Sequence, residues 1–371
     1  MTPPYNPFFI RLRKFGMKEL ILKSDERAVF ALRSLYCRYG YTPYKMSRFE
    51  EYDLYVRNKD FLVSDKIITF SGDGGRLLAL KPDVTLSIVK NAPDEAGEVQ
   101  KVYYNENVYR DHREILQAGL ECVGDLGDYE IAEVVLLAAK SLEALESPFV
   151  LDISHMGLIS AMLDSCGFDE EEKRQATEHL RRKNSHELKA LCTEKAWEKL
   201  KVLVLCHGGL EELSRVEAVL TTSAEQKALA ELKQLMAMLE GSGFGENVRL
   251  DFSVGSDLRY YSGVVFRGYL EGIPSSILSG GQYDRLPQRM GRKARAIGFA
   301  IYADLLQRYK REEESYDVDT LILHDGSVAP AVLAAKAEEA AASGTVLVAR
   351  QVPKGRKWKN LLRFEKGEAV I

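Results

Sequence analysis

The sequence predicts an α+β protein: a mainly antiparallel sheet flanked by helices, with a helical insertion and a small C-terminal α/β module. Short stretches of alternating apolar and polar residues, joined by tight turns, indicate paired strands before residue 125. Residues 165–241 are charged, rich in Glu, Lys and Leu and poor in strand formers, which is typical of helices. Beyond the polar run 310–316, residues 319–348 show a strand, an alanine-rich helix and a second strand.

Turn and capping residues indicate where the first predicted helix and strands begin and end. Residues 24–39 have apolar positions at helical spacing, and Gly40 follows where such a helix would end. An Asp-Gly pair beginning at Asp73 separates the stretches 66–71 and 76–80, which is a strong signal for a β-hairpin.

Asp83 follows a Lys-Pro pair that interrupts the second of these strands. It is placed to cap a helix over 84–91, and capping alone is a sufficient explanation for its presence. The remaining predicted core elements are a helix at 129–145, strands at 149–153 and 248–254, and a strand that continues into a helix over 296–309.

Residues 101–124 concentrate the chemistry of the chain. They alternate as two strands joined by a polar turn over 111–114, and Gln117, Gly119 and Glu121 share one face of the second strand. An amide, a position without a side chain and a carboxylate can line a pocket for a small polar ligand. The same alternation is also typical of a half-buried strand with a solvated face.

Arg110 ends the first of these two strands, beside that face. Its planar guanidinium suits a carboxylate or a phosphate better than any other side chain does, which favours an anion site. Taken alone, an Arg in this position is more often part of a surface salt bridge.

Composition and charge exclude several classes of function. The chain has 371 residues and a net charge of −4, without the excess of Lys and Arg that broad nucleic-acid binding requires. Its five cysteines are scattered and include no C-x-x-C pair, which favours a reducing cytoplasm. No apolar run approaches the roughly 18 residues of a membrane span, so we predict neither membrane insertion nor secretion.

Common catalytic motifs are absent from the sequence. There is no G-x-G-x-x-G after a strand, no P-loop, no H-E-x-x-H and no G-x-S-x-G. His179 and His186 lack the spacing of metal ligands, and His112 lies in the polar turn, so no metal site is predicted. Gly280 and Gly281 can bring the backbone close to a ligand, although such a pair more often forms a turn or a bulge.

We predict two domains. The core covers residues 1–312 and includes the helical insertion at about 165–241. Residues 317–371 form the small C-terminal module, which follows the polar linker.

Four motifs carry a resemblance to a known family. In order and spacing they resemble the catalytic core of class II histidyl-tRNA synthetases and, more closely, the paralogous regulatory subunits of ATP phosphoribosyltransferase, over roughly residues 8–310. The resemblance implies a class II aminoacyl-tRNA synthetase-like fold with a truncated anticodon-binding domain at the C-terminus. The motifs are LALKPDVT, the pair VYR and LQAGLECVG, DLRYYSGVVF, and the pair GGQYDRL and AIGFAIYADLL.

The resemblance also implies a pocket for free histidine. Two carboxylates can hold an α-ammonium group, an Arg can meet a carboxylate, an amide and a hydroxyl add directional hydrogen bonds, and Tyr rings can wall the imidazole. No catalytic residue and no cofactor are implied. The matching positions are Asp83, Thr85, Arg110, Gln117, Glu121, Tyr260 and Tyr261.

The chain departs from the synthetases where they bind ATP. Ser256 stands where they carry an Arg, and Arg259 is displaced by three residues, so it points to the other face of a strand. Tyr302 and Leu305 stand where they carry a Gly and an Arg that meet ATP. Each lost cation removes on the order of 3 kcal/mol of transition-state stabilisation, so we do not expect adenylate formation.

We therefore expect a non-catalytic regulatory subunit that activates a short-form ATP phosphoribosyltransferase catalytic subunit in the first step of histidine biosynthesis and transmits feedback inhibition by histidine. The short turn over 111–114 and the half-length C-terminal module argue against tRNA binding. The resemblance further implies a homodimer and hetero-oligomers with the catalytic subunit. Two alternatives remain: a divergent histidyl-tRNA synthetase, and a histidine-binding paralogue with another partner.

Overall fold

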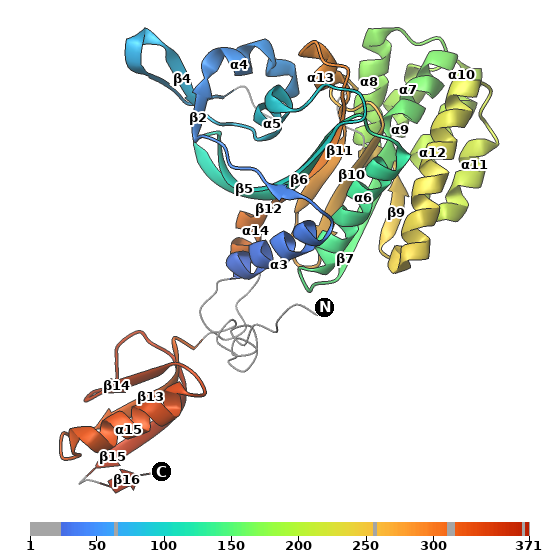
Figure 1. Cartoon of the computed structure of the whole chain (residues 1–371). Coiled ribbons are helices and arrows are strands. Elements are labelled where there is room, and N and C mark those ends of the chain that lie inside the picture. Colours follow the sequence, from blue (N-terminus) through green and yellow to red (C-terminus); the bar gives the residue numbers. More distant parts are fainter. Residues whose placement is uncertain (1–23, 63–65, 255–257, 310–315, 366–367, 371) are drawn as a thin grey trace, which may run out of the picture. The chain divides into compact units, whose positions relative to one another are not determined.

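The computed structural model describes residues 24–62, 66–254, 258–309, 316–365 and 368–370 (Figure 1). Ser24–Tyr309 form one compact unit, and the described residues after Tyr309 belong to a second unit.

A nine-stranded mixed sheet is the frame of the larger unit, in the order β1-β5-β6-β12-β11-β10-β7-β9-β8. All neighbours from β5 to β7 are antiparallel, whereas β1 joins β5 and β9 joins β7 in parallel. The predicted mainly antiparallel sheet is therefore confirmed. The strands are β1 (Thr42–Pro43), β5 (Val99–Arg110), β6 (Arg113–Gly124), β7 (Phe149–His155), β8 (His207–Gly208), β9 (Val248–Asp251), β10 (Val264–Leu270), β11 (Leu278–Gln282) and β12 (Arg295–Tyr302).

Three helices pack on one face of this sheet: α3 (Ser24–Arg38), α6 (Asp128–Glu143) and α14 (Ala303–Tyr309) (Figure 1). Leu120 and Cys122, on the predicted apolar side of β6, are fully buried in the core beneath them. Burying a Leu side chain contributes about 1.5–3 kcal/mol, so this layer fixes which face of β6 turns inward.

A second hydrophobic core lies on the opposite face, which bears the candidate site. Val102 and Val108 of β5 pack there with α5 (Thr85–Asn91) and with Tyr55 of α4 (Tyr52–Arg57). A small sheet completes this side, with β2 (Phe49–Glu51), β4 (Leu77–Leu80) and β3 (Thr69–Ser71) in antiparallel order. The predicted hairpin around Asp73 is present, with Gly74 in the left-handed region at φ 70°.

A run of helices covers the predicted insertion at about 165–241 and starts one helix before it. Its helices are α7 (Met156–Ser165), α8 (Glu170–Arg181), α9 (Ser185–Ala190), α10 (Glu194–Leu205), α11 (Leu213–Glu217) and α12 (Ser223–Leu239). Helix α7 is largely apolar, so the change to charged residues that marks the other helices comes only after it. A capping box fixes the start of α12, where Thr222 Oγ1 accepts from Glu225 N at 3.3 Å.

In its described residues, the C-terminal unit contains a four-stranded sheet in the order β14-β13-β15-β16 and one helix. Strand β13 pairs in parallel with both β14 and β15, and β16 closes the edge in antiparallel fashion. The predicted strand, helix and strand are confirmed, and two further strands follow. The elements are β13 (Val318–His324), α15 (Pro330–Ala341), β14 (Val346–Ala349), β15 (Trp358–Glu365) and β16 (Glu368–Val370).

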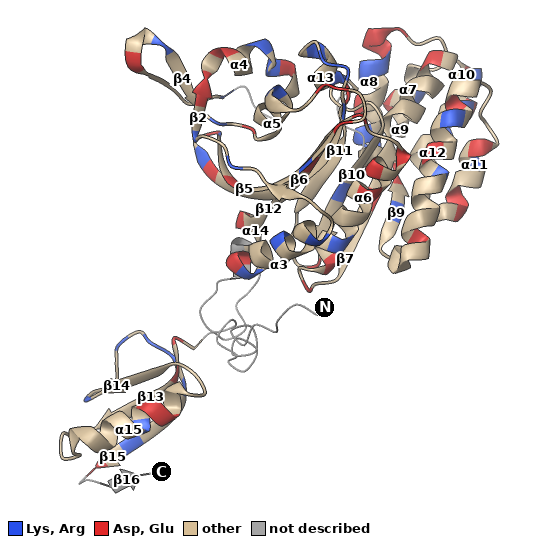
Figure 2. Cartoon of the chain, viewed as in Figure 1, with Lys and Arg blue, Asp and Glu red and all other residues tan. Residues whose placement is uncertain are grey.

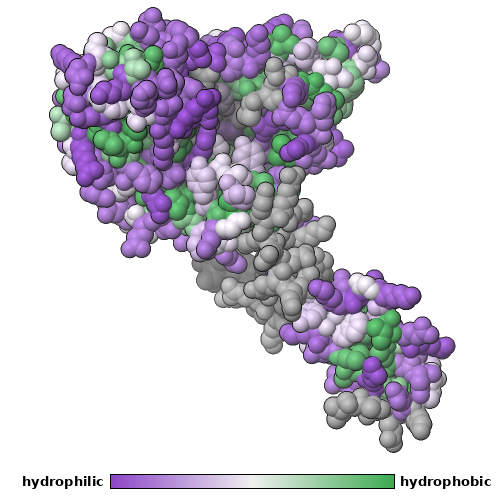
Figure 3. Space-filling view, turned by 180° about the vertical axis from the view of Figure 1, so that it is seen from behind, coloured by the Kyte–Doolittle hydropathy of each residue, from purple (hydrophilic) through white to green (hydrophobic). Residues whose placement is uncertain are grey.

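Lys and Arg are interspersed with Asp and Glu along the helices and strands of the larger unit (Figure 2). Hydrophobic side chains form separate patches among hydrophilic ones (Figure 3). Within the described ranges, no helix is both long and apolar enough to span a bilayer. The same residues contain no group of three or more His, Cys, Asp or Glu arranged to hold a metal ion.

Candidate ligand-binding pocket

A pocket of about 490 Å³ opens on the sheet face that carries α5. This volume lies in the range of small-molecule sites. The structure brings together all of the residues that the resemblance assigned to a histidine site, because each of them lines this one pocket: Asp83, Thr85, Arg110, Gln117, Glu121, Tyr260 and Tyr261.

The β5–β6 hairpin positions three of these side chains. Its turn consists of Asp111 and His112, both at positive φ (50° and 61°), as a type I′ turn requires. The resulting register places Glu121 opposite Val102 and Gln117 opposite Glu106. Gln117 and Glu121 therefore share the pocket face, as the alternation predicted.

Gly119 was expected to leave an open gap between these two side chains, and this expectation is wrong. A Cβ atom at Gly119 would lie 2.6 Å from the hydroxyl oxygen of Tyr104 and 2.2 Å from Phe299 O. Tyr104, which faces Gly119 across the strands, fills the space. The glycine thus admits an aromatic side chain instead of a ligand.

Glu121 is the most enclosed carboxyl group in the pocket, with 2% of its surface exposed. Thr85 Oγ1 donates to its Oε1 at 2.8 Å, and the Tyr283 hydroxyl donates to Oε2. Burial raises the pKa of Glu121 to about 8, although the two hydrogen bonds act in the opposite direction. The group is therefore largely protonated at neutral pH in the ligand-free protein.

Arg110 is 5% exposed, and its Nε has no hydrogen-bond partner among the described residues. Asp83 is half-buried and accepts from Leu86 N at 2.9 Å through Oδ1. Burial raises the pKa of Asp83, and the Arg110 charge partly offsets that rise. Asp83 thus caps the first turn of α5 and also lines the pocket. Its role as a helix cap is compatible with a place in the ligand site.

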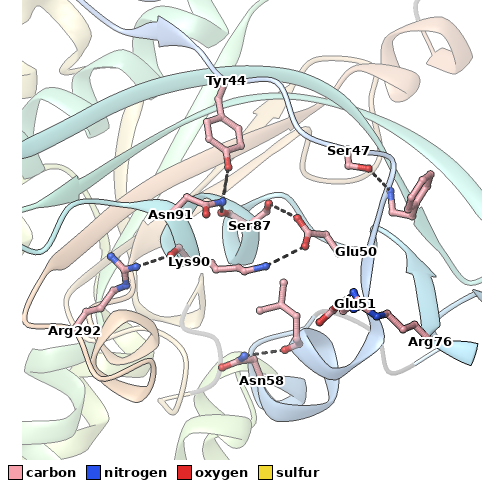
Figure 4. Close-up of polar contacts among 12 residues, drawn as sticks. Tyr44, Ser47, Glu50, Glu51, Asn58, Arg76, Ser87, Lys90, Asn91 and Arg292 are labelled. Carbon is pink, nitrogen blue, oxygen red and sulfur yellow. Dashed lines mark hydrogen bonds and ion pairs between the residues drawn. The ribbon is translucent and has the colours of Figure 1, made fainter. Parts of the chain in front are cut away.

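Helix α5 is held in place by a polar network (Figure 4). On β2, Glu50 accepts from Ser87 Oγ at 3.1 Å and from Lys90 Nζ at 3.3 Å, and Arg292 donates to Lys90 O. These bonds tie the helix that carries Thr85 to two other parts of the unit.

Tyr260 and Tyr261 form an aromatic wall. Their ring centroids are 4.6 Å apart at an interplanar angle of 65°. A Cβ atom at Gly281, on β11, would lie 2.7 Å from the Tyr261 ring. The glycine therefore allows this ring to pack closely against the strand. Burial raises the pKa of both hydroxyls, which remain neutral donors.

The pocket has further lining residues that the sequence did not identify, among them Tyr104, Arg267, Ser279 and Tyr283. Tyr283 lies within a motif that carried the resemblance, and its bond to Glu121 spans 162 residues. Arg267 and Ser279 are cross-strand neighbours on β10 and β11. Only the strand order and register, which were not predicted, bring these positions to one face.

The positions that distinguish the chain from a synthetase lie as follows. Ser256 is outside the described residues. Arg259 is exposed and does not line the pocket, whereas Tyr302 does line it. Leu305 packs against the hydrophobic core. Leu305 is thus an apolar side chain packed toward the core, at the position where the resemblance leads one to expect a synthetase Arg.

A family model for histidyl-tRNA synthetase matches residues 21–306. The ATP phosphoribosyltransferase regulatory subunit of Clostridium kluyveri is 30% identical over 311 residues, covering 78% of this chain and 79% of the relative. The subunit of the same name from Acetivibrio thermocellus is also 30% identical, covering 79% of this chain and 75% of its own.

Solved structures show the same fold. A Bacillus halodurans structure described as an ATP phosphoribosyltransferase regulatory subunit/histidyl-tRNA synthetase has a TM-score of 0.74 at 23% identity, covering 92% of this chain and 94% of its own. An ATP phosphoribosyl transferase (HisG:HisZ) complex from Thermotoga maritima contains a chain with a TM-score of 0.59 at 18% identity, covering 74% of this chain and 96% of its own. With the family-model match and the 30% identity to curated relatives, these findings show that the chain belongs to the histidyl-tRNA synthetase family, among its ATP phosphoribosyltransferase regulatory subunits.

Proposed function

We propose that the protein is a regulatory subunit of ATP phosphoribosyltransferase that binds free histidine in this pocket and has no catalytic activity of its own. The observation that carries the proposal is the buried guanidinium of Arg110, whose Nε has no partner among the described residues and which lines a pocket that also contains the carboxyl groups of Asp60, Asp83 and Glu121. A buried N–H group without a hydrogen-bond partner is costly, and an amino-acid carboxylate would supply one.

The other polar groups suit the remaining parts of an amino acid. Asp83 and Glu121 can accept from an α-ammonium group, and Gln117 offers an amide beside them. Tyr260 and Tyr261 provide an aromatic wall for an imidazole. Because Glu121 is largely protonated before binding, a cationic ligand group next to it would favour release of its proton.

The lack of catalysis is inferred from the ATP half of the pocket. Leu305 lies in the core and Arg259 lies outside the pocket lining, so neither position offers a cation to a transferring phosphate. Tyr302 adds a bulky ring to the lining. Adenylate formation depends on fixed positive charge at that point.

The names of the relatives support assembly of this chain with a catalytic subunit. Curated relatives are named regulatory subunits, and the Thermotoga maritima structure is described as a HisG:HisZ complex. We infer that this chain joins a short-form catalytic subunit, activates it and transmits inhibition by histidine, as a cytoplasmic homodimer within larger hetero-oligomers. We also propose residues 1–312 and 317–371 as its two domains; the division into compact units at Tyr309 supports this boundary.

The decisive experiment mixes the purified protein with a short-form catalytic subunit and measures the reaction of ATP with phosphoribosyl pyrophosphate. We expect higher activity than with the catalytic subunit alone, and inhibition when histidine is added. Equal activity with and without this chain would remove the proposal.

Histidine-dependent exchange of pyrophosphate into ATP separates the proposal from the alternative of a divergent histidyl-tRNA synthetase. We expect no exchange above background. A robust signal, measured beside an authentic synthetase as positive control, would establish the alternative.

A further inference from the structure

A second cavity, of about 270 Å³, lies where α6 and α12 run beside each other at the ends of four strands of the large sheet. It shares no lining residue with the histidine pocket. Ligand sites occur preferentially at junctions of this kind, where a core meets an inserted subdomain.

The floor of this cavity is buried and its rim is polar. Val264, Leu235 and Gln282 are 2%, 6% and 6% exposed, whereas Asp128 and Glu231 on the rim are exposed. A buried floor with several apolar side chains under a charged rim suits a ligand with an apolar body and one polar end.

His155 is a buried polar group of the cavity lining, at 4% exposure. Its Nδ1 accepts from Leu158 N at 3.1 Å, so the neutral ring carries its proton on Nε2. Nε2 lies 3.4 Å from Glu231 Oε2 and donates toward it. This bond lowers the pKa of Glu231, which keeps that carboxylate ionised and oriented at the rim.

The charges around the cavity favour a cation. Asp128 and Glu231 are acidic, and Arg295 is the one basic residue that lines it. Arg295 is already engaged, because Nη1 donates to Leu126 O at 2.8 Å and Nε lies 3.5 Å from Asp284 Oδ2. Glu231 also has a partner, since Oε1 lies 4.0 Å from Lys227 Nζ, but this long, solvent-exposed contact is weak and a ligand ammonium group can replace it.

We propose that this cavity is a second ligand site, specific for a small primary amine with an apolar or aromatic body, whose ammonium group pairs with Glu231. The cavity volume corresponds to roughly nine water molecules at about 30 Å³ each, which accommodates a ligand of about that number of non-hydrogen atoms. The proposal is independent of histidine binding in the first pocket.

The two cavities approach each other along one short segment. Gln282 lines the second cavity, and the next residue, Tyr283, binds Glu121 in the first pocket. Asp284 anchors the segment, accepting from Gln282 Nε2 at 2.6 Å and from Ala296 N at 3.0 Å. The two sites thus meet at consecutive residues on opposite sides of the sheet.

The test titrates the full chain with benzylamine and observes saturation-transfer NMR signals of the ligand, with benzoate and benzyl alcohol as anionic and neutral probes of similar size. We expect saturable binding of benzylamine with a dissociation constant on the order of 1 mM, as suits a ligand of eight non-hydrogen atoms. Benzoate and benzyl alcohol should bind at least tenfold more weakly. Comparable binding of the three probes, or no saturable binding of benzylamine, would overturn the proposal.

Variants assign the binding to this cavity. Glu231→Gln should weaken benzylamine binding at least tenfold, whereas Glu240→Gln, at an exposed acid outside the cavity, should leave it unchanged. Glu121→Gln should also leave it unchanged, because Glu121 belongs to the histidine pocket. Binding that survives Glu231→Gln, or that is lost with Glu121→Gln, contradicts the assignment whether or not histidine binds in the first pocket.

Discussion

Tyr283 donates a hydrogen bond to Glu121 across 162 residues of sequence. Thr85 donates to the other oxygen of the same carboxyl group at 2.8 Å, so three distant segments of the chain meet there. Burial outweighs both bonds and brings the pKa of Glu121 to about 8. Protonation of this one group should therefore influence stability and ligand binding near neutral pH.

The first prediction concerns stability against pH. The pKa of Glu121 rises from 4.5 to about 8 on folding, so the folded state binds more protons than the unfolded state between these values. Stability from this group is full below about pH 4.5 and is lost as the pH rises toward about 8, with a slope of at most about 1.4 kcal/mol per pH unit. Glu121→Gln should flatten that slope in urea denaturation series.

The matched control is Glu98→Gln, at an exposed carboxyl group of the same unit, which should leave the pH profile unchanged. An identical slope in wild type and Glu121→Gln would show that Glu121 is ionised in the folded protein.

A second prediction uses the Tyr283 bond. Its loss in Tyr283→Phe removes a donor that favours the charged carboxylate, so the pKa of Glu121 should rise further above about 8. If histidine binds the ionised form, its affinity should increase with pH up to the pKa of Glu121, and the plateau should move to higher pH in Tyr283→Phe. Calorimetric titrations between pH 6 and pH 9 measure the shift.

Tyr109→Phe is the control for that experiment, because this hydroxyl binds exposed Glu114 and lies outside the pocket. If histidine affinity reached its plateau at the same pH in wild type and both variants, Glu121 would not change its protonation state when histidine binds.

Sequence reasoning predicted which face of β6 is apolar and which is polar, because alternation reports the two sides of a strand directly. It did not predict that Tyr104 would fill the space over Gly119, since that depends on the register between β5 and β6. The sequence also did not reveal the contact of Tyr283 with Glu121, because no local pattern links positions so far apart. The candidate ligand residues came from family resemblance, which encodes such long-range contacts without explaining them.

A third prediction addresses Arg110. Arg110→Met preserves length and removes the charge, so the ligand carboxylate loses a charged hydrogen-bond donor worth about 1.5–3 kcal/mol, or roughly 10–100-fold in histidine affinity. Folding stability should fall at neutral pH, because the Arg110 charge partly offsets the raised pKa of Asp83, and the variant leaves that carboxyl group without it. Calorimetry and urea denaturation measure the two effects.

Arg113→Met, at an exposed Arg of the same hairpin, should affect neither quantity. Undiminished histidine binding by Arg110→Met would show that Arg110 has a structural role only.

The last prediction concerns the close approach of Glu121 to β12. A Cβ atom at Gly298 would lie 1.7 Å from Glu121 Oε2 and 2.5 Å from Leu120 O, so Gly298→Ala forces both the carboxyl group and the neighbouring strand to move. We expect a loss of stability of about 1–3 kcal/mol, as for other overpacked interiors, together with loss of histidine binding. Gly241→Ala, where no atom lies within 4 Å of the added Cβ, is the neutral control.

The double variant Gly298→Ala/Glu121→Ala separates the two contacts. Removing the carboxyl group relieves the shorter contact and leaves the one with Leu120 O, so stability should recover only in part relative to Gly298→Ala. Urea denaturation of the four proteins in this cycle gives the coupling between the residues. A coupling of zero would mean that the strand backbone, and not the buried carboxyl group, requires glycine at this position.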